Sequence, residues 1–271
     1  MPHAKITALN VYPVKSCRGI ALARAQLTPT GLANDRSWLI INENGRFQTQ
    51  RELPRLSLIK TQLEGSGLKL SAYGMPDLAV SAAPGGERIS VTIWDDQCSG
   101  IDAGPGCAEW LSSFLNKAVR LVRFDPSRVR PCDRKWVGDA PAQNMFADAY
   151  PLLVMSEASL ENLNHRLSIP VPMNRFRPNI VLSGIKAHDE DRIHELSGQA
   201  VRLRIVKPCT RCAITTTDQA TGRVGEEPMR TLKSYRWDPK LRGVTFGQNA
   251  IILKGFESVL RLGQELEIAW V

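Results

Sequence analysis

Hydrophobic and polar positions alternate over short stretches along most of the chain, which is the pattern of half-buried β-strands. The Asn-Glu-Asn-Gly segment at residues 42–45 predicts a tight turn, because Asn and Gly accept the positive φ that a sharp reversal needs. Short strands separated by turn residues are therefore expected throughout the first half. They cover residues 6–11, 38–41, 47–50, 68–72, 78–81 and 89–94.

The second half continues this rhythm and adds helices. Apolar residues recur at helical spacing over residues 107–117, over the segment that follows Ser156, and in a short stretch at 228–235. Ser156 suits an N-cap, because its hydroxyl accepts a hydrogen bond from an unpaired N–H of the first helical turn. Strands are expected at residues 152–155, 179–182, 201–206, 244–253 and 265–269.

The chain is expected to divide into two units. Residues 125–145 contain three prolines and read as a long irregular connection, so we place a boundary near residues 120–140 and expect domains at 1–120 and 121–271. Many short strands with three or four helices predict a mainly β fold with a few helices (α+β), built from β-barrel-like domains. The chain has no GxGxxG or Walker-type loop, which removes support for dinucleotide and P-loop classes.

Composition narrows the class of protein. Hydrophobic residues make up 43% and charged residues 23% of the 271, which is typical of a globular chain. The longest apolar runs are far shorter than the roughly 20 residues of a membrane span. The first residues show no secretory signal, so we expect a cytoplasmic protein that does not associate with membranes.

The net charge permits an anionic ligand or partner. Lys and Arg number 35 against 27 Asp and Glu, a balance of +8. No basic helix and no basic motif interleaved with aromatics is present, so nucleic acid is not expected as a partner. The densest basic stretch, residues 128–135, is expected to be a solvent-exposed loop.

Cys209 and Cys212 form the one cysteine spacing that suggests chemistry. They follow a strongly alternating strand and have Lys207 and Arg211 beside them, and cationic neighbours favour the thiolate form of cysteine. A thioredoxin-like pair needs a helix after the first cysteine, whereas residues 213–217 favour a strand. A single thiolate that binds a soft metal centre, or that carries sulfur, stays open.

Other metal centres have weaker support. A structural zinc site needs two further ligands, and only His188 and His194 have a suitable spacing. These two histidines lie in a charged stretch and are expected to be exposed in a loop. An iron–sulfur cluster needs four cysteines in a tighter arrangement than this chain offers.

Polar side chains that suit an anion lie at the ends of several expected strands. Lys15 and Ser16 follow the first strand, Arg36 precedes the second, and Arg177 precedes the strand at 179–182. Phosphate recognition favours Arg, Lys, Ser hydroxyls and exposed N–H groups at such ends. Each residue taken singly is also typical of a solvated surface. Asp148, in the loop before the strand at 152–155, is typical of a turn or cap residue.

Seven motifs in order along nearly the whole chain resemble a known family, the MOSC-domain proteins that carry an N-terminal MOSC β-barrel domain. The bacterial YcbX-like proteins and the mitochondrial amidoxime-reducing components are similar examples. The resemblance implies a MOSC N-terminal β-barrel-like domain over residues 1–120 and a β-barrel MOSC domain over residues 121–271. The motifs are YPVKS (12–16), DR (35–36), SEASL (156–160), FRPN (176–179), KPCTRC (207–212), TLKSYR (231–236) and FGQN (246–249).

The resemblance implies a molybdenum cofactor, a pterin dithiolene with a terminal phosphate that holds molybdenum. It places the protein ligand to molybdenum on Cys212, with Cys212 and Asp148 as catalytic residues. Ala149 and Tyr150 stand where small hydroxyl residues are common, so their contacts are expected from backbone N–H groups. The cofactor-binding residues that it implies are Lys15, Ser16, Arg36, Asp148, Ala149, Tyr150, Arg177, Thr210, Arg211, Cys212 and Asn249.

The resemblance also implies an activity, the reduction of N-hydroxylated compounds such as amidoximes, hydroxylamines and N-hydroxylated bases. Two electrons and two protons release the oxygen as water, with the oxygen removed at molybdenum. The chain ends after the last expected barrel strand, so electrons are expected from a separate ferredoxin, cytochrome or flavoprotein reductase. The basic stretch with Arg130 and Arg134 is expected to attract an acidic donor. The alternatives are a sulfur carrier that uses a cysteine persulfide and a module that only delivers cofactor.

Overall fold

Seven strands of the described part of the chain form a closed barrel. The computed structural model describes residues 2–65, 67–83 and 85–271. All neighbouring barrel strands are antiparallel except β12 and β13, and the pairing of β12 with β17 closes the barrel. In order around the barrel the strands are β12 (Leu152–Ser156), β13 (Ile180–Ser183), β1 (His3–Val11), β19 (Glu265–Trp270), β14 (Ile193–Ser197), β15 (Arg202–Thr210) and β17 (Gly243–Lys254).

The alternation of apolar and polar residues explains the barrel. Inward-facing apolar side chains from strands far apart in the sequence meet in one core, among them Ile6, Leu152, Ile180, Leu203 and Ile268. Full burial of one such side chain contributes roughly 1.5–3 kcal/mol, so the shared core holds the strands together. The predicted mainly β fold with a barrel is confirmed.

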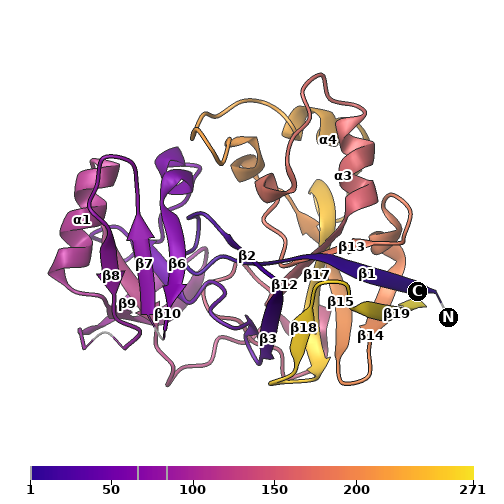
Figure 1. Ribbon diagram of the computed structural model, residues 1–271, viewed down its shortest axis with the longest axis horizontal. Helices are drawn as coiled ribbons and strands as arrows, with labels where there is room; N and C mark the ends of the chain where they lie inside the picture. Colours follow the sequence, from indigo (N-terminus) through magenta and orange to yellow (C-terminus); the bar gives the residue numbers. More distant parts are fainter. Residues whose placement is uncertain (1, 66, 84) are drawn as a thin grey trace.

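The first strand of the chain lies in the barrel of the second half. β1 pairs with β13 on one side and β19 on the other, and so the two termini lie side by side (Figure 1). β2 (Ile20–Leu22) pairs with the C-terminal end of β1. A separate small sheet consists of β3 (Arg24–Thr28), β4 (Gly31–Leu32) and β18 (Val259–Arg261). A division into residues 1–120 and 121–271 stays a prediction, and strand pairing crosses that boundary.

The rest of the first half folds beside the barrel, at the left of Figure 1. Helix α1 (Pro105–Leu115) packs Trp110 and Phe114 into a core with the β6–β8 sheet. The four-stranded sheet has the order β5 (Trp38–Ile41), β11 (Arg120–Phe124), β10 (Asp96–Asp102) and β9 (Arg88–Ile93). The three-stranded sheet has the order β6 (Lys60–Glu64), β7 (Gly67–Ser71) and β8 (Leu78–Val80).

Helices cover one end of the barrel. Ser156 caps α3 (Glu157–Asn164), since its hydroxyl accepts a hydrogen bond from the N–H of Ser159 at 3.1 Å, which confirms the predicted cap. No helix among the described residues is long and apolar enough to cross a membrane. The remaining elements are α2 (Arg134–Val137), α4 (Met229–Tyr235), β16 (Trp237–Asp238) and the 3₁₀ helices η1 (Pro54–Leu58), η2 (Met173–Arg175), η3 (Asp189–Arg192) and η4 (Ala213–Thr216).

Two predicted strands are wrong. Residues 47–50 contain only an isolated bridge from Phe47 to Ile41, and the chain then turns. In the predicted strand at 213–217, residues 213–216 form η4 and Thr217 makes only an isolated bridge to Val224. There the Thr215 hydroxyl donates to the Cys212 carbonyl at 3.1 Å, and such local hydrogen bonds compete with strand pairing.

Candidate functional site

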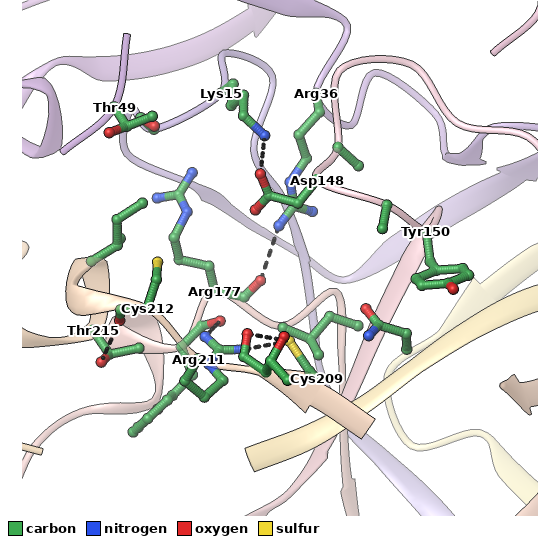
Figure 2. A pocket seen from close by; sticks show the side chains of 18 of the residues that line it. Lys15, Arg36, Thr49, Asp148, Tyr150, Arg177, Cys209, Arg211, Cys212 and Thr215 are labelled. Carbon is green, nitrogen blue, oxygen red and sulfur yellow. Dashed lines mark hydrogen bonds and ion pairs between the residues drawn. The ribbon is translucent and has the colours of Figure 1, made fainter. Parts of the chain in front are cut away.

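One cavity collects every residue that the sequence motifs singled out as cofactor-binding. Its walls come from the turn after β1, the segment before β5, the loop before β12, the segment before β13, and the end of β15 (Figure 2). The structure therefore brings together side chains that lie as far apart in the sequence as Lys15 and Asn249. The predicted residues that line it are Lys15, Ser16, Arg36, Asp148, Ala149, Tyr150, Arg177, Thr210, Arg211, Cys212 and Asn249.

Lys15 is buried at the cavity wall, with 6% of its surface exposed. Its ammonium donates to the Phe146 carbonyl at 3.0 Å and to Asp148 Oδ1 at 2.7 Å, as Figure 2 shows for the carboxylate. Burial lowers the pKa of Lys15, and the Asp148 carboxylate opposes that shift. An ammonium has three N–H donors, so one donor of this group is left for a ligand.

Asp148 is an ionised carboxylate at neutral pH. The surrounding protein opposes its ionisation, but the Lys15 ammonium and a hydrogen bond from Trp94 outweigh this, so the pKa of Asp148 lies below its usual range. Such a carboxylate accepts hydrogen bonds and does not supply a proton. Its role at this site is therefore to hold Lys15 and to orient N–H groups.

Two arginines enclose the Tyr12 ring. The guanidinium of Arg36 lies 4.4 Å from the ring centroid and that of Arg177 lies 4.2 Å from it, which is favourable cation–π geometry. The Tyr12 hydroxyl donates to the Pro178 carbonyl at 3.2 Å, and burial raises the pKa of Tyr12 to about 12. The neutral phenol thus keeps both cations in fixed positions beside the cavity.

Arg177 carries a buried donor that the protein does not satisfy. Its Nη1 donates to the Cys17 carbonyl at 2.7 Å, whereas its Nη2 has no hydrogen-bond partner among the described residues. Burial lowers the pKa of Arg177 to about 10, so the group is still a cation at neutral pH. A buried unpaired guanidinium is costly, which indicates that an anionic ligand belongs beside it.

The two cysteines of the 207–212 motif have different surroundings. Cys209 Sγ accepts a hydrogen bond from Arg211 Nη1 at 3.0 Å, and Arg211 Nη2 donates to the Phe176 carbonyl at 2.6 Å. Cys212 is the N-cap residue that directly precedes η4, and its sulfur lies on the side of the Arg177 guanidinium in Figure 2. No described donor or acceptor engages the Cys212 thiol, so it is available to a soft metal centre.

The predicted exposure of the basic stretch is wrong at Arg130. This side chain is buried, and its Nη1 donates to Asn144 and to the carbonyls of Met145 and Ala147, the last at 2.6 Å. Its Nη2 pairs with Asp96 at 2.6 Å. Arg130 therefore holds the shape of the loop that carries Asp148, while its neighbours Arg128, Arg134 and Lys135 are exposed.

The loop after Asp148 offers its backbone to a ligand. Within the described part of the chain, no hydrogen bond uses the amide N–H of Ala149 or Tyr150, as expected for contacts made by backbone groups. The Tyr150 ring is buried, and burial raises the pKa of its hydroxyl. Thr210 is exposed at the end of β15, and Asn249 lies on β17 opposite Leu153 of β12.

The sequence interpretation missed several residues of this site. Asn179 accepts from Arg36 at 3.0 Å and from the Leu153 N–H at 3.1 Å, so it joins two walls of the cavity. Asp35 accepts from the Tyr12 N–H at 2.8 Å and pairs with Arg36. Asp35 lies in the DR motif and Asn179 in the FRPN motif, which the sequence analysis recognised. The sequence did not show that these two side chains are buried at the site. Also missed were Thr49, Arg51, Trp94 and Thr215.

Comparison with known proteins agrees with this geometry. Residues 3–118 match the MOSC N-terminal beta barrel domain and residues 141–267 match the MOSC domain. Mitochondrial amidoxime-reducing component 1 of Mus musculus is 41% identical over 242 residues, 85% of this chain and 71% of the relative. Component 1 of Homo sapiens is 38% identical over 281 residues, 96% and 83% of the two chains. Component 2 of Homo sapiens is 38% identical over 248 residues, which cover 88% of this chain and 74% of the relative. The chain therefore belongs to the family of MOSC proteins that includes the mitochondrial amidoxime-reducing components.

Proposed function

We propose that this protein is a molybdenum-cofactor-dependent reductase of N-hydroxylated compounds such as amidoximes, hydroxylamines and N-hydroxylated bases. One observation carries the proposal: a single cavity combines an unengaged thiol at Cys212 with a buried cation at Arg177 whose Nη2 has no partner among the described residues. A pterin dithiolene with a terminal phosphate needs both a soft ligand for its metal and an anion site. The relatives, which are named amidoxime-reducing components, support the same activity.

The residues present fit that cofactor. Cys212 would ligate the metal, because a thiolate suits a soft, sulfur-rich centre. Lys15, Arg36 and Arg177 would hold the anionic phosphate and the pterin. The amides of Ala149 and Tyr150, which have no partner among the described residues, would add backbone donors. When bound, the cofactor supplies the two-electron removal of oxygen from nitrogen.

The protein's own part is to position charge. Asp148 remains a carboxylate and holds the Lys15 ammonium at 2.7 Å, so a cation stays at the cavity wall. Arg36 is fixed by Asp35, by Asn179 and by the Arg177 carbonyl, the last at 3.1 Å. Rigid donors of this kind cost no reorganisation when charge develops on a departing oxygen. The balanced change is an N–OH group plus two electrons and two protons giving an N–H group and water.

Electrons would come from a separate redox protein, a ferredoxin, a cytochrome or a flavoprotein reductase. The exposed cations Arg128, Arg134 and Lys135 lie close together in sequence, beside the loop that leads to the cavity. A positive face of this kind speeds the approach of an acidic partner. Arg130, which is buried, takes no part in that attraction.

The test is metal and pterin analysis of protein produced in a host that makes molybdenum cofactor, followed by a dye-driven reduction assay with benzamidoxime and hydroxylamine. We expect close to one molybdenum per chain and turnover of both compounds. Molybdenum without turnover of either would favour a cofactor carrier. Protein without molybdenum but with a persulfide on Cys212 would replace the proposal with sulfur transfer.

A further inference from the structure

Trp94 lies at the tip of the β9–β10 hairpin and lines the cavity from the first half of the chain. Its φ is 55°, in a two-residue turn where Asn and Gly are the usual residues, because a bulky side chain is strained there. The residue is 42% exposed. An exposed, strained tryptophan at a cavity wall is not explained by core packing.

The indole is nevertheless held in one position. Its Nε1 donates to Asp148 Oδ1 at 3.0 Å, and the Phe47 ring meets it edge-on at a centroid distance of 5.2 Å. The Arg51 guanidinium lies over the ring at 4.3 Å from its centroid. Three contacts thus fix the ring of a residue that is still partly exposed and that lines the cavity.

The second carboxylate oxygen of Asp148, Oδ2, is an acceptor beside the Trp94 indole. Both hydrogen bonds that Asp148 accepts, from Lys15 and from Trp94, fall on Oδ1, and no donor among the described residues reaches Oδ2. An aromatic face and an ionised acceptor therefore stand side by side on the cavity wall. This pair matches a flat conjugated group that carries an N–H.

We propose, on the basis of the function proposed above, that Trp94 is the surface on which the planar part of the substrate lies. Asp148 Oδ2 then accepts a hydrogen bond from the amino group next to the N–O bond. Stacking on an aromatic side chain needs a flat π-system, which amidoximes and N-hydroxylated bases have and hydroxylamine lacks. Trp94 thus makes the protein prefer planar, amino-bearing substrates over small ones.

The chain offers a matched control for this residue. Trp270 is also exposed and also lies near an arginine, with Arg192 at 5.7 Å from its ring centroid. It does not line the cavity. Replacement of Trp270 therefore tests the loss of an exposed tryptophan and its cation contact without touching the site.

The experiment measures kcat/KM for benzamidoxime and for hydroxylamine, with molybdenum content, in Trp94→Ala, Trp94→Phe, Trp270→Ala and the unaltered protein. We expect Trp94→Ala to lower the benzamidoxime-to-hydroxylamine ratio of kcat/KM about tenfold, mainly through KM. Trp94→Phe keeps a flat ring but no N–H, so it should retain most of the ratio. Trp270→Ala should leave the ratio unchanged.

A ratio in Trp94→Ala equal to that of the unaltered protein would overturn the inference. So would a Trp94→Phe variant that behaves like Trp94→Ala, because the hydrogen bond and not the ring face would then decide the preference. Failure of the proposed function has a different signature, since the unaltered protein itself would then reduce neither compound, whether or not it holds molybdenum.

Discussion

Cys209 and Cys212 show how neighbouring residues of one type take different roles. The sulfur of Cys209 accepts a hydrogen bond from Arg211, whereas Cys212 lines the cavity and its thiol has no hydrogen-bond partner among the described residues. We expect Cys212→Ser to lower benzamidoxime turnover by at least about a hundredfold, because a hydroxyl is a poor ligand for a soft metal. Cys209→Ser should stay within about threefold, since a serine oxygen also accepts from Arg211. Steady-state assays normalised to molybdenum content check this, and comparable losses in both variants would contradict it.

Arg177 is expected to lower the folding stability of the cofactor-free protein and to favour cofactor binding. In cofactor-free protein its buried Nη2 has no described partner, which costs folding free energy. We expect Arg177→Met to lower molybdenum and pterin content about tenfold, while the melting temperature of the cofactor-free protein stays equal or rises. Metal analysis and thermal unfolding measure the two effects. A cofactor-free variant that melts well below the parent protein would show that Arg177 has mainly a structural role.

At the residue scale the motifs located the site but not its internal contacts. Lys15, Arg36, Arg177 and Cys212 were predicted to meet, and they do. The sandwich of Tyr12 between two arginines was not foreseen, because it depends on which of these side chains are buried. The metal and cofactor roles of these residues stay predictions.

A buried carboxylate ties strands of the four-stranded sheet together. Asp125 follows β11 and accepts from Ser127, from Ser99 of β10 at 3.1 Å and from Arg88 of β9 at 2.9 Å. The hydrogen bonds from Ser127, helped by those from Arg88 and Ser99, hold the pKa of Asp125 well below its usual range despite burial.

Because the folded state lowers this pKa, the ionised carboxylate stabilises the fold above the ordinary aspartate pKa of about 3.9, and that stabilisation fades as pH falls further. We expect Asp125→Asn to melt several degrees below the parent protein at neutral pH, with the difference shrinking below about pH 4. Thermal unfolding followed from neutral pH to pH 3 checks this. A constant difference over that range would refute it.

The loop before β12 depends on one buried arginine. Arg130 bonds to the carbonyls that shape the loop and pairs with Asp96, so Arg130→Glu should lower both the melting temperature and the cofactor content. Arg134 is exposed on α2, and Arg134→Glu should change only the KM for an acidic electron donor and its dependence on salt. The KM for the electron donor at two salt concentrations, together with the melting temperature, distinguishes the effects of the two variants. Equal effects of both variants would contradict this assignment.

Two differences between the predicted and the observed elements, the segment at 47–50 and strand β10, share a cause. The segment at 47–50 alternates like a strand, but beyond Phe47 it turns into the cavity wall, where Thr49 faces the site. β10 was missed because residues 96–102 are mostly polar, and only pairing with β9 and β11 makes them a strand. In both segments, pairing with distant strands determines whether a strand forms. The local pattern of apolar and polar residues carries no information about that pairing.

At the scale of the whole molecule, the barrel needs both ends of the chain. We expect residues 121–271 produced alone to lack a cooperative unfolding transition, because without β1 the edges of β13 and β19 are unpaired and the core loses Ile6. Co-production of residues 1–126 with 127–271 restores every strand and should give a folded complex. Thermal unfolding monitored by circular dichroism checks both samples. A cooperative transition in 121–271 alone would contradict the expectation.

The place of β1 in the barrel also sets the order of assembly. Residue 3 pairs with residue 267, and residue 9 pairs with residue 180. Contacts between such distant residues carry a large loop-closure entropy and slow folding. On the ribosome β1 emerges long before β19, so it must wait for that strand before the barrel is complete. Until then an apolar strand has unpaired edges, and chaperones that shield such segments during synthesis should determine the yield of folded protein.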